Sequence, residues 1–241
     1  MALGEHAHRG IARLVGVLAC GVASVALAQS STPDRQLWVD YVPSWHAGAR
    51  ATDELELSFR TAWSGAAPTQ YWATNTFEWN ATPWLGLDAI GAVVESRGPS
   101  HGSGYFEMRP SAGARFTWRN ERVRASEFLR VEHRMLRPLD AAPFTIERVR
   151  HREQLLVALN HPSLAASRTA FLIADAEWFL VHNGRGGWTS NQLRARAGLG
   201  YRWSAHRSFE CILNDTQRRS DLDPVFEDGD HILRLRWREA F

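Results

Sequence analysis

Lysine is absent from this sequence, and cysteine is nearly absent. All 28 basic residues are arginine, yet the 241-residue chain has a formal net charge of only +2. A protein with so little net charge lacks a strong positive field, so we expect no nucleic acid as a partner. The two cysteines are Cys20 and Cys211. Because Cys20 falls in the predicted leader, the exported chain would keep one thiol and no internal disulfide.

Motifs of several enzyme classes are also missing. The sequence contains no phosphate-binding loop, no dinucleotide-binding fingerprint and no Cys/His spacing typical of a zinc site. These absences favour a non-enzymatic protein, and we predict no cofactor and no metal site.

Long apolar runs are confined to the start of the chain. Residues 1–28 resemble a secretory signal peptide, because Arg9 and Arg13 precede an apolar run that ends at the small-x-small sequence Ala26-Leu27-Ala28. We expect cleavage after Ala28. Lipoprotein processing at Cys20 is the alternative, since the preceding residues loosely resemble a lipobox.

No later segment reaches the roughly 18 apolar residues that a membrane-spanning helix needs. If the exported domain, residues 29–241, lies in a membrane, it must therefore cross as strands.

Apolar and polar residues alternate with a period of two over most of the chain, which is typical of β-strands. We found no helical period after residue 30. Eleven alternating runs are predicted as strands, at 35–46, 52–63, 69–80, 84–97, 104–119, 122–137, 147–160, 168–182, 188–203, 207–218 and 228–241. Because bacterial single-chain barrels have an even number of strands, we expect one run near Pro43 to be miscounted. The prediction is an all-β, antiparallel, up-and-down transmembrane β-barrel of 10–12 strands, with twelve favoured.

The predicted connections alternate between tight turns and longer loops. Short periplasmic turns opposite long outer loops are typical of outer-membrane barrels, and tryptophan near the strand ends is typical of their aromatic girdles. If the carboxyl end of the chain lies on the periplasmic side, five tryptophans fall near the periplasmic rim: Trp79, Trp84, Trp118, Trp203 and Trp237. The same orientation places Trp63, Trp72 and Trp188 near the outer rim.

Charged residues recur on one face of the central strands, where a buried ion needs a partner. The predicted lumen network consists of Glu107, Arg109, Glu132, Arg134, Arg150, Arg152, Asp175, Glu177, Arg194 and Arg196. Pairing across the predicted turns sets Arg109 against Glu132, Glu132 against Arg152, Arg152 against Asp175, Asp175 against Arg196, Glu107 against Arg134, Arg150 against Glu177, Glu177 against Arg194, and Glu210 against Arg238. Arg134 beside Arg150 is the one like-charge contact that this pairing predicts.

Further arginines share the inward phase and lack obvious acidic partners: Arg119, Arg122, Arg124, Arg148, Arg202, Arg234 and Arg236. Two interpretations of this charged face stay open. It fills the lumen and fixes the register, or its surplus arginines line a path for small anionic solutes.

The carboxyl end carries a pattern that barrel-assembly machinery commonly recognises, an aromatic residue preceded by apolar residues at alternate positions. The residues that fit it are Leu233, Leu235, Trp237 and Phe241, whereas Glu239 departs from it. We therefore expect the assembly machinery and outer-membrane lipid as partners.

Two histidines interrupt the apolar outward face, and a carboxylate lies near one of them. The predicted pairing makes His133 and His151 cross-strand neighbours, with Glu153 close by. A histidine pair with a carboxylate is suited to acid–base chemistry or metal binding. An outer-membrane lipid-modifying enzyme is therefore one alternative to a role in small-solute passage or envelope maintenance. A soluble periplasmic barrel that binds an apolar ligand is another.

Several of these motifs resemble a known family. Residues 130–134, 148–152, Glu177, 191–194 and 198–201 are similar to the bacterial family catalogued as domain of unknown function 2490. The resemblance extends from Trp38 to Phe241. It implies an outer-membrane barrel and brings no assigned activity and no catalytic residues.

Overall fold

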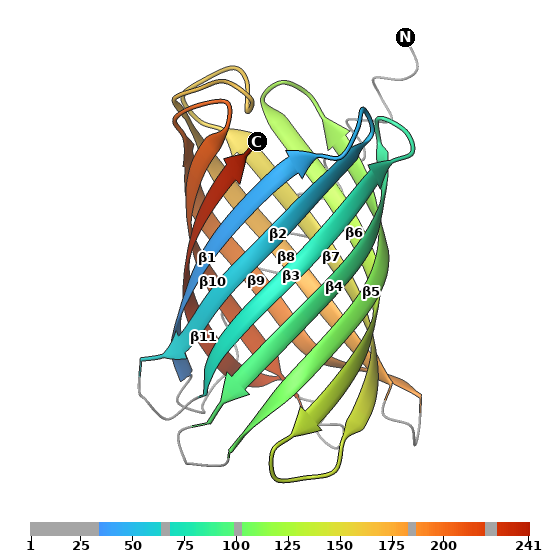
Figure 1. Cartoon of the computed structure of the whole chain (residues 1–241). Helices are drawn as coiled ribbons and strands as arrows, with labels where there is room; N and C mark the ends of the chain where they lie inside the picture. Colours follow the sequence, from blue (N-terminus) through green and yellow to red (C-terminus); the bar gives the residue numbers. More distant parts are fainter. Residues whose placement is uncertain (1–33, 64–67, 99–102, 183–186, 220–225) are drawn as a thin grey trace.

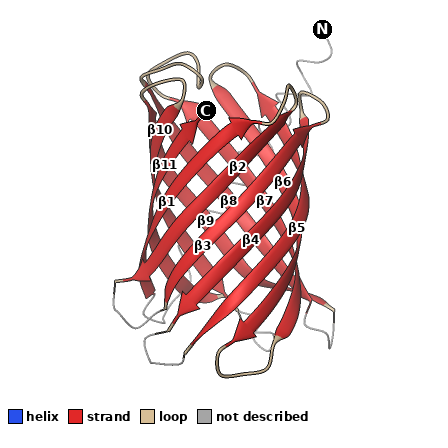
Figure 2. Ribbon diagram, viewed as in Figure 1, coloured by secondary structure: helices blue, strands red, loops and turns tan. Residues whose placement is uncertain are grey.

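The alternating runs form one closed β-barrel, shown in Figures 1 and 2 from a computed structural model. The structure describes residues 34–63, 68–98, 103–182, 187–219 and 226–241. The expected signal peptide and its cleavage site lie outside the described residues. Eleven strands are described: β1 (Asp34–His46), β2 (Ala51–Ala62), β3 (Thr69–Asn80), β4 (Leu85–Arg97), β5 (Gly104–Arg119), β6 (Val123–Pro138), β7 (Phe144–Ala158), β8 (Thr169–His182), β9 (Trp188–Arg202), β10 (Arg207–Arg218) and β11 (Glu227–Ala240).

Strand number and closure differ from the prediction. Each strand pairs antiparallel with the next along the chain, but β1 pairs with β11 in parallel, from Asp34 opposite Asp230 to Ser44 opposite Ala240. In an up-and-down meander with an odd number of strands, the first and last strands run in the same direction. The preference for twelve strands was wrong. It rested on the rule that such barrels have an even number of strands, whereas here the eleven strands that the alternation identifies are closed by the parallel pair of β1 and β11.

Within the ranges described, no helix has the length and apolar character needed to cross a membrane.

Side chains alternate between the lumen and the outside along every strand. In β4, the inward residues Asp88, Ile90, Ala92, Val94 and Ser96 are all buried. The outward positions of the barrel are apolar and exposed, and they include Val39, Tyr41, Leu57, Phe59, Phe77, Leu87, Val93, Met108, Leu129, Val131, Leu172, Leu180, Leu199 and Leu213. The barrel therefore places apolar side chains outside and most of its charged side chains inside, the reverse of a water-soluble barrel.

The rim where β11 ends, here called the carboxyl-terminal rim, is the one at which the chain end C is marked in Figure 1. Aromatic residues gather at this rim. The outward Trp79, Trp84 and Trp118 lie there, and the rings of Trp203 and Trp237 meet at 4.6 Å. At the opposite rim, Trp63 and Trp188 are exposed, as is Tyr71. Trp72 was placed wrongly in that girdle, because its side chain faces the lumen.

Four of the five connections at the carboxyl-terminal rim are short, as predicted, but the fifth is not. The segment 159–168, between β7 and β8, spans ten residues and folds into the mouth of the barrel. There Leu164 packs against the inward-facing Leu156, Phe171, Ile173 and Ile212. Gly200 lies opposite Phe171, and any Cβ at that position would overlap the Phe171 ring. This apolar cluster narrows the lumen near one rim.

Candidate functional site: the arginine-lined lumen

The lumen contains an elongated cavity of about 910 Å³. Its lining runs from Asn120 and His206 at the carboxyl-terminal rim to Gln36, Tyr105 and Asp230 near the opposite rim. Seventeen arginines and seven carboxylates are among the lining residues. The cavity therefore has a guanidinium-rich wall along the barrel.

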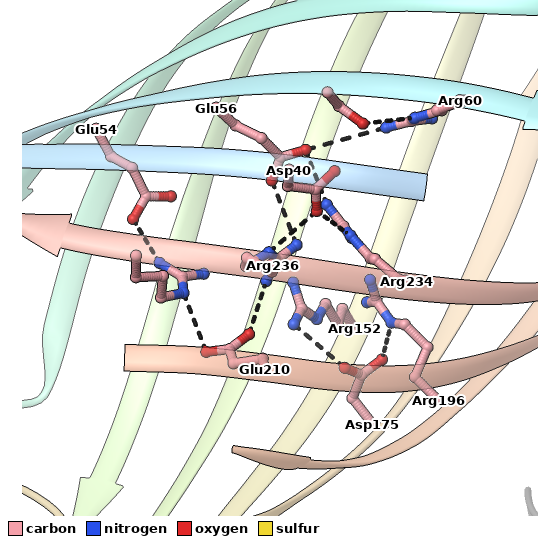
Figure 3. Close-up of polar contacts among 12 residues, drawn as sticks. Asp40, Glu54, Glu56, Arg60, Arg152, Asp175, Arg196, Glu210, Arg234 and Arg236 are labelled. Carbon is pink, nitrogen blue, oxygen red and sulfur yellow. Dashed lines mark hydrogen bonds and ion pairs between the residues drawn. The ribbon is translucent and has the colours of Figure 1, made fainter. Parts of the chain in front are cut away.

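The middle of the cavity is crossed by ion pairs between β11 and its neighbours, drawn in Figure 3. Arg234 and Arg236 extend inward from alternate positions of β11, and both contact Asp40 on β1. They also reach Glu56 on β2, at 2.9 and 3.3 Å. Arg236 contacts Glu210 on β10 at 3.3 Å as well. This cluster joins four strands around the parallel seam.

Sequence reasoning left Arg234 and Arg236 without acidic partners, which was wrong. Their partners Asp40 and Glu56 lie almost 200 residues away in the chain and meet them only because β1 pairs with β11. The even number of strands that we expected implies an antiparallel pair of first and last strands. Such a pair does not predict the register that brings Asp40 and Glu56 to these arginines.

A second cluster is centred on Glu132 of β6, which is fully buried. Its carboxylate forms an ion pair with Arg130 at 2.6 Å and accepts hydrogen bonds from Arg148 at 2.6 Å and Arg150 at 2.8 Å. Arg150 also donates through Nε to Glu177 of β8, at 2.9 Å. Glu177 in turn contacts Arg194 of β9, at 3.4 Å. One chain of charges thus links β6, β7, β8 and β9.

Two further buried carboxylates complete the network. Glu107 contacts Arg109 at 2.8 Å and Arg134 at 2.6 Å. Asp175 contacts Arg152 at 3.2 Å and also forms an ion pair with Arg196 (Figure 3). Every one of the ten residues predicted for the lumen network therefore forms an ion pair with another member of that set or with an arginine beside it.

The predicted partners of Glu132 were wrong. Ser111, not Arg109, lies opposite Glu132 on β5, and Arg148, not Arg152, lies opposite it on β7. Arg150 likewise lies opposite Arg130 and not beside Arg134. Turns set a register only to within a few residues, and a slip by an even number keeps the same face inward. The inward phase was therefore predictable. The two pairs predicted for Glu132 are not formed, whereas the other six predicted pairs are ion pairs in the structure: Arg152–Asp175, Asp175–Arg196, Glu107–Arg134, Arg150–Glu177, Glu177–Arg194 and Glu210–Arg238.

Four carboxylates of this network lie behind the arginines that contact them, against the barrel wall. Asp40, Glu107, Glu132 and Glu177 are at most 2% exposed and do not line the cavity, although their arginine partners do. At these positions the longer guanidinium side chains, and not the carboxylates, therefore line the cavity.

Aromatic rings hold several of these guanidinium groups in place. Arg60 of β2 lies between Trp38 and Trp72, with its guanidinium carbon 3.9 and 3.7 Å from the two ring centroids. The ring centroid of Phe179 on β8 lies about 5 Å from the guanidinium carbons of Arg148, Arg150 and Arg194. Cation–π contact of this kind stabilises arginine where water is scarce. Sequence reasoning missed this feature because it placed Trp72 in an aromatic girdle and did not use Trp38.

Arginines without an acidic partner lie near the carboxyl-terminal rim. Arg119 and Arg124 are opposite one another on β5 and β6, and both line the cavity. Arg202 donates to the backbone oxygen of Leu164 at 3.0 Å. In the part of the chain that the structure describes, no ion pair involves any of these three arginines. Their charges leave this mouth of the lumen positive.

A family model described as "Protein of unknown function (DUF2490)" matches residues 35–223 of this sequence. The chain belongs to this family. The match confirms the resemblance noted in the sequence, although it ends before β11 and so covers less than the predicted extent. Comparison with curated proteins and with solved structures gives no match.

In this DUF2490 chain, the two outward histidines are not neighbours, contrary to the prediction. His133 lies opposite Glu147 and its Nδ1 contacts the Glu147 carboxylate, whereas His151 lies opposite Leu129 and stacks on Trp178. The register of β6 on β7 is shifted from the predicted one, which separates the two rings. Glu153 remains beside His151, and Glu127, which the sequence did not single out, joins them. A catalytic histidine pair is thus not formed.

Proposed function

We propose that this chain is an outer-membrane β-barrel whose arginine-rich lumen passes small anionic solutes. The observation that carries the proposal is the inverted distribution of side chains. Apolar residues cover the outside of a closed barrel, and charged residues surround an internal cavity of about 910 Å³.

The outer surface supports a membrane location. Soluble proteins rarely expose a continuous apolar surface of large extent, yet here exposed apolar positions occur on strands around the whole barrel. Closure leaves no unpaired strand edge, which is a requirement for a strand protein in lipid. The tryptophans at both rims match the aromatic girdles of membrane barrels. The carboxyl-terminal pattern ending at Phe241 is consistent with delivery by barrel-assembly machinery.

The lumen supports an anionic solute. Beyond the seven carboxylates of the lining, six more contact its arginines from the wall: Asp40, Glu78, Asp88, Glu107, Glu132 and Glu177. The seventeen lining arginines still outnumber them all. Rings of arginine favour anions and repel cations. A soluble barrel for an apolar ligand is less well supported, because this lining is polar and charged.

The test is the reversal potential of the purified protein in planar bilayers across a KCl gradient. We expect a conductance that favours chloride. Replacing the unpaired Arg119 and Arg124 by Gln should shift the reversal potential towards zero, since both line the positive mouth. Arg97→Gln is the matched control, because Arg97 is exposed and pairs with Glu95 away from the cavity. Folded protein with no conductance, or with cation selectivity, would contradict the proposal.

A further inference from the structure

Three metal-ligating side chains come together on the outer face of the barrel, away from the lumen. Glu127 of β6 lies directly opposite Glu153 of β7, and His151 precedes Glu153 by two residues on the same face. One donor atom from each of the three lies within 4.8 Å of the others. Among the described residues, no other group of three such side chains is this compact.

The surroundings of this cluster make its charge costly. Glu153 is only 7% exposed, and within the described structure its Oε2 has no hydrogen-bond partner. The ring of Trp178 stacks on His151 at 5.6 Å, and the buried Ala125 and Ala176 pack with Leu155 close by. A buried carboxylate without a partner is costly, and a second carboxylate facing it adds repulsion.

We propose that Glu127, His151 and Glu153 bind a divalent transition-metal ion, with Zn²⁺ as the best match. Two carboxylates and a neutral imidazole form a complex with Zn²⁺ that carries no net charge, which suits an apolar face. Zinc is bound by His nitrogen and by Asp or Glu oxygen at about 2.0–2.2 Å, and sites with three protein ligands leave a fourth position open. Imidazole disfavours Mg²⁺ and Ca²⁺, which prefer oxygen ligands alone.

Two observations point to a ligand here: the three donor atoms lie close together, and the buried Oε2 of Glu153 has no hydrogen-bond partner among the described residues. The sequence grouped His151 and Glu153 with His133 as one possible metal-binding set. It did not include Glu127, because the register of β6 on β7 is not readable from the spacing of the residues. This site does not depend on the proposed transport function, since none of its residues lines the lumen cavity.

The experiment is a Zn²⁺ titration of the full-length protein, folded in detergent and stripped with a chelator, by isothermal titration calorimetry. We expect one strong site per barrel. Glu153→Gln should weaken binding at least tenfold, and His151→Ala should abolish it. The matched control is His133→Ala, because His133 with Glu147 supplies a similar outward pair with only two donors. Co²⁺ absorption provides a second measurement, with a visible band that His151→Ala removes.

Folding of each variant is checked by the mobility shift of the unheated protein on gels. If Glu153→Gln does not fold, Glu127→Gln at the more exposed position replaces it. No strong site in the wild type, or equal affinity in wild type and the Glu127 or Glu153 variant, would overturn the proposal. That result would instead favour two carboxyl groups sharing a proton.

Discussion

Glu132 is the position at which the lumen network is most sensitive to substitution. Its buried carboxylate contacts three arginines, and for Arg130 and Arg148 it is the only carboxylate in ion-pair distance among the described residues. Glu132→Gln keeps the shape of the side chain but removes the charge. Two guanidinium groups would then lie near one another without a carboxylate, while Arg150 would keep Glu177.

Removing one partner from a buried ion pair costs about 3–5 kcal/mol, which is the loss of unfolding free energy that we expect for Glu132→Gln. Equilibrium urea unfolding in lipid vesicles, followed by tryptophan fluorescence, measures it. Glu95→Gln is the control, because Glu95 and Arg97 are half-exposed or more, and such pairs contribute about 0–1 kcal/mol.

A double-mutant cycle with Arg148→Gln isolates the pair itself. We expect strong coupling, because the second substitution removes a charge that the first leaves unpaired. Equal losses of unfolding free energy for Glu132→Gln and Glu95→Gln would contradict this prediction and would mean that lumen water replaces the carboxylate at little cost.

Three further predictions concern the lumen wall and the carboxyl end. Arg60→Ala should destabilise the barrel by about 2 kcal/mol or more, since it removes stacking on Trp38 and Trp72. Urea unfolding measures this loss, and a loss smaller than that of Glu95→Gln would contradict the prediction. Deleting Phe241 should lower the amount of heat-modifiable protein in the outer membrane. Because Phe241 is 68% exposed, we expect the unfolding free energy of the purified variant to be unchanged. That result would show that the deletion impairs assembly and not the packing of the folded barrel. Glu239→Tyr should preserve assembly. The loss of unfolding free energy should be no more than about 1 kcal/mol, since the substitution removes only rim contacts to Arg207 and Tyr41. Reduced levels of the variant in the outer membrane would contradict this prediction.

The strands and their inward faces were predictable because alternation is a local property of the sequence. The run 193–203 identifies β9 and its inward Arg194 and Arg196 without knowledge of any partner strand. The pairs of Glu132 were not predictable, because a slip of two residues on β5 and four on β7 leaves the alternation unchanged.

Long-range features were the least accessible. The parallel pairing of β1 with β11 depends on the total number of strands, and it alone brings Asp40 to Arg234 and Arg236. Trp72 shows a second limit. Tryptophan near a strand end suggests a girdle, and only its inward phase, shared with Gln70 and Thr74, places it in the lumen beside Arg60.

If the barrel lies in a membrane as proposed, outward side chains face lipid and inward side chains face water, and the reactivity of Cys211 distinguishes the two environments. Cys211 is exposed on the outer face of β10, between Leu199 and Leu235 on the neighbouring strands. With Cys20→Ala it is the only thiol in the chain. Protein in lipid vesicles is treated with a charged thiol reagent and with a lipid-soluble one.

The matched comparison is Cys211→Ser combined with Thr74→Cys, which places the thiol in the lumen lining. We expect Cys211 to react with the lipid-soluble reagent and to resist the charged one until the protein is unfolded, while the thiol at position 74 reacts with the charged reagent. Rapid reaction of Cys211 with the charged reagent in folded, vesicle-bound protein would contradict this expectation.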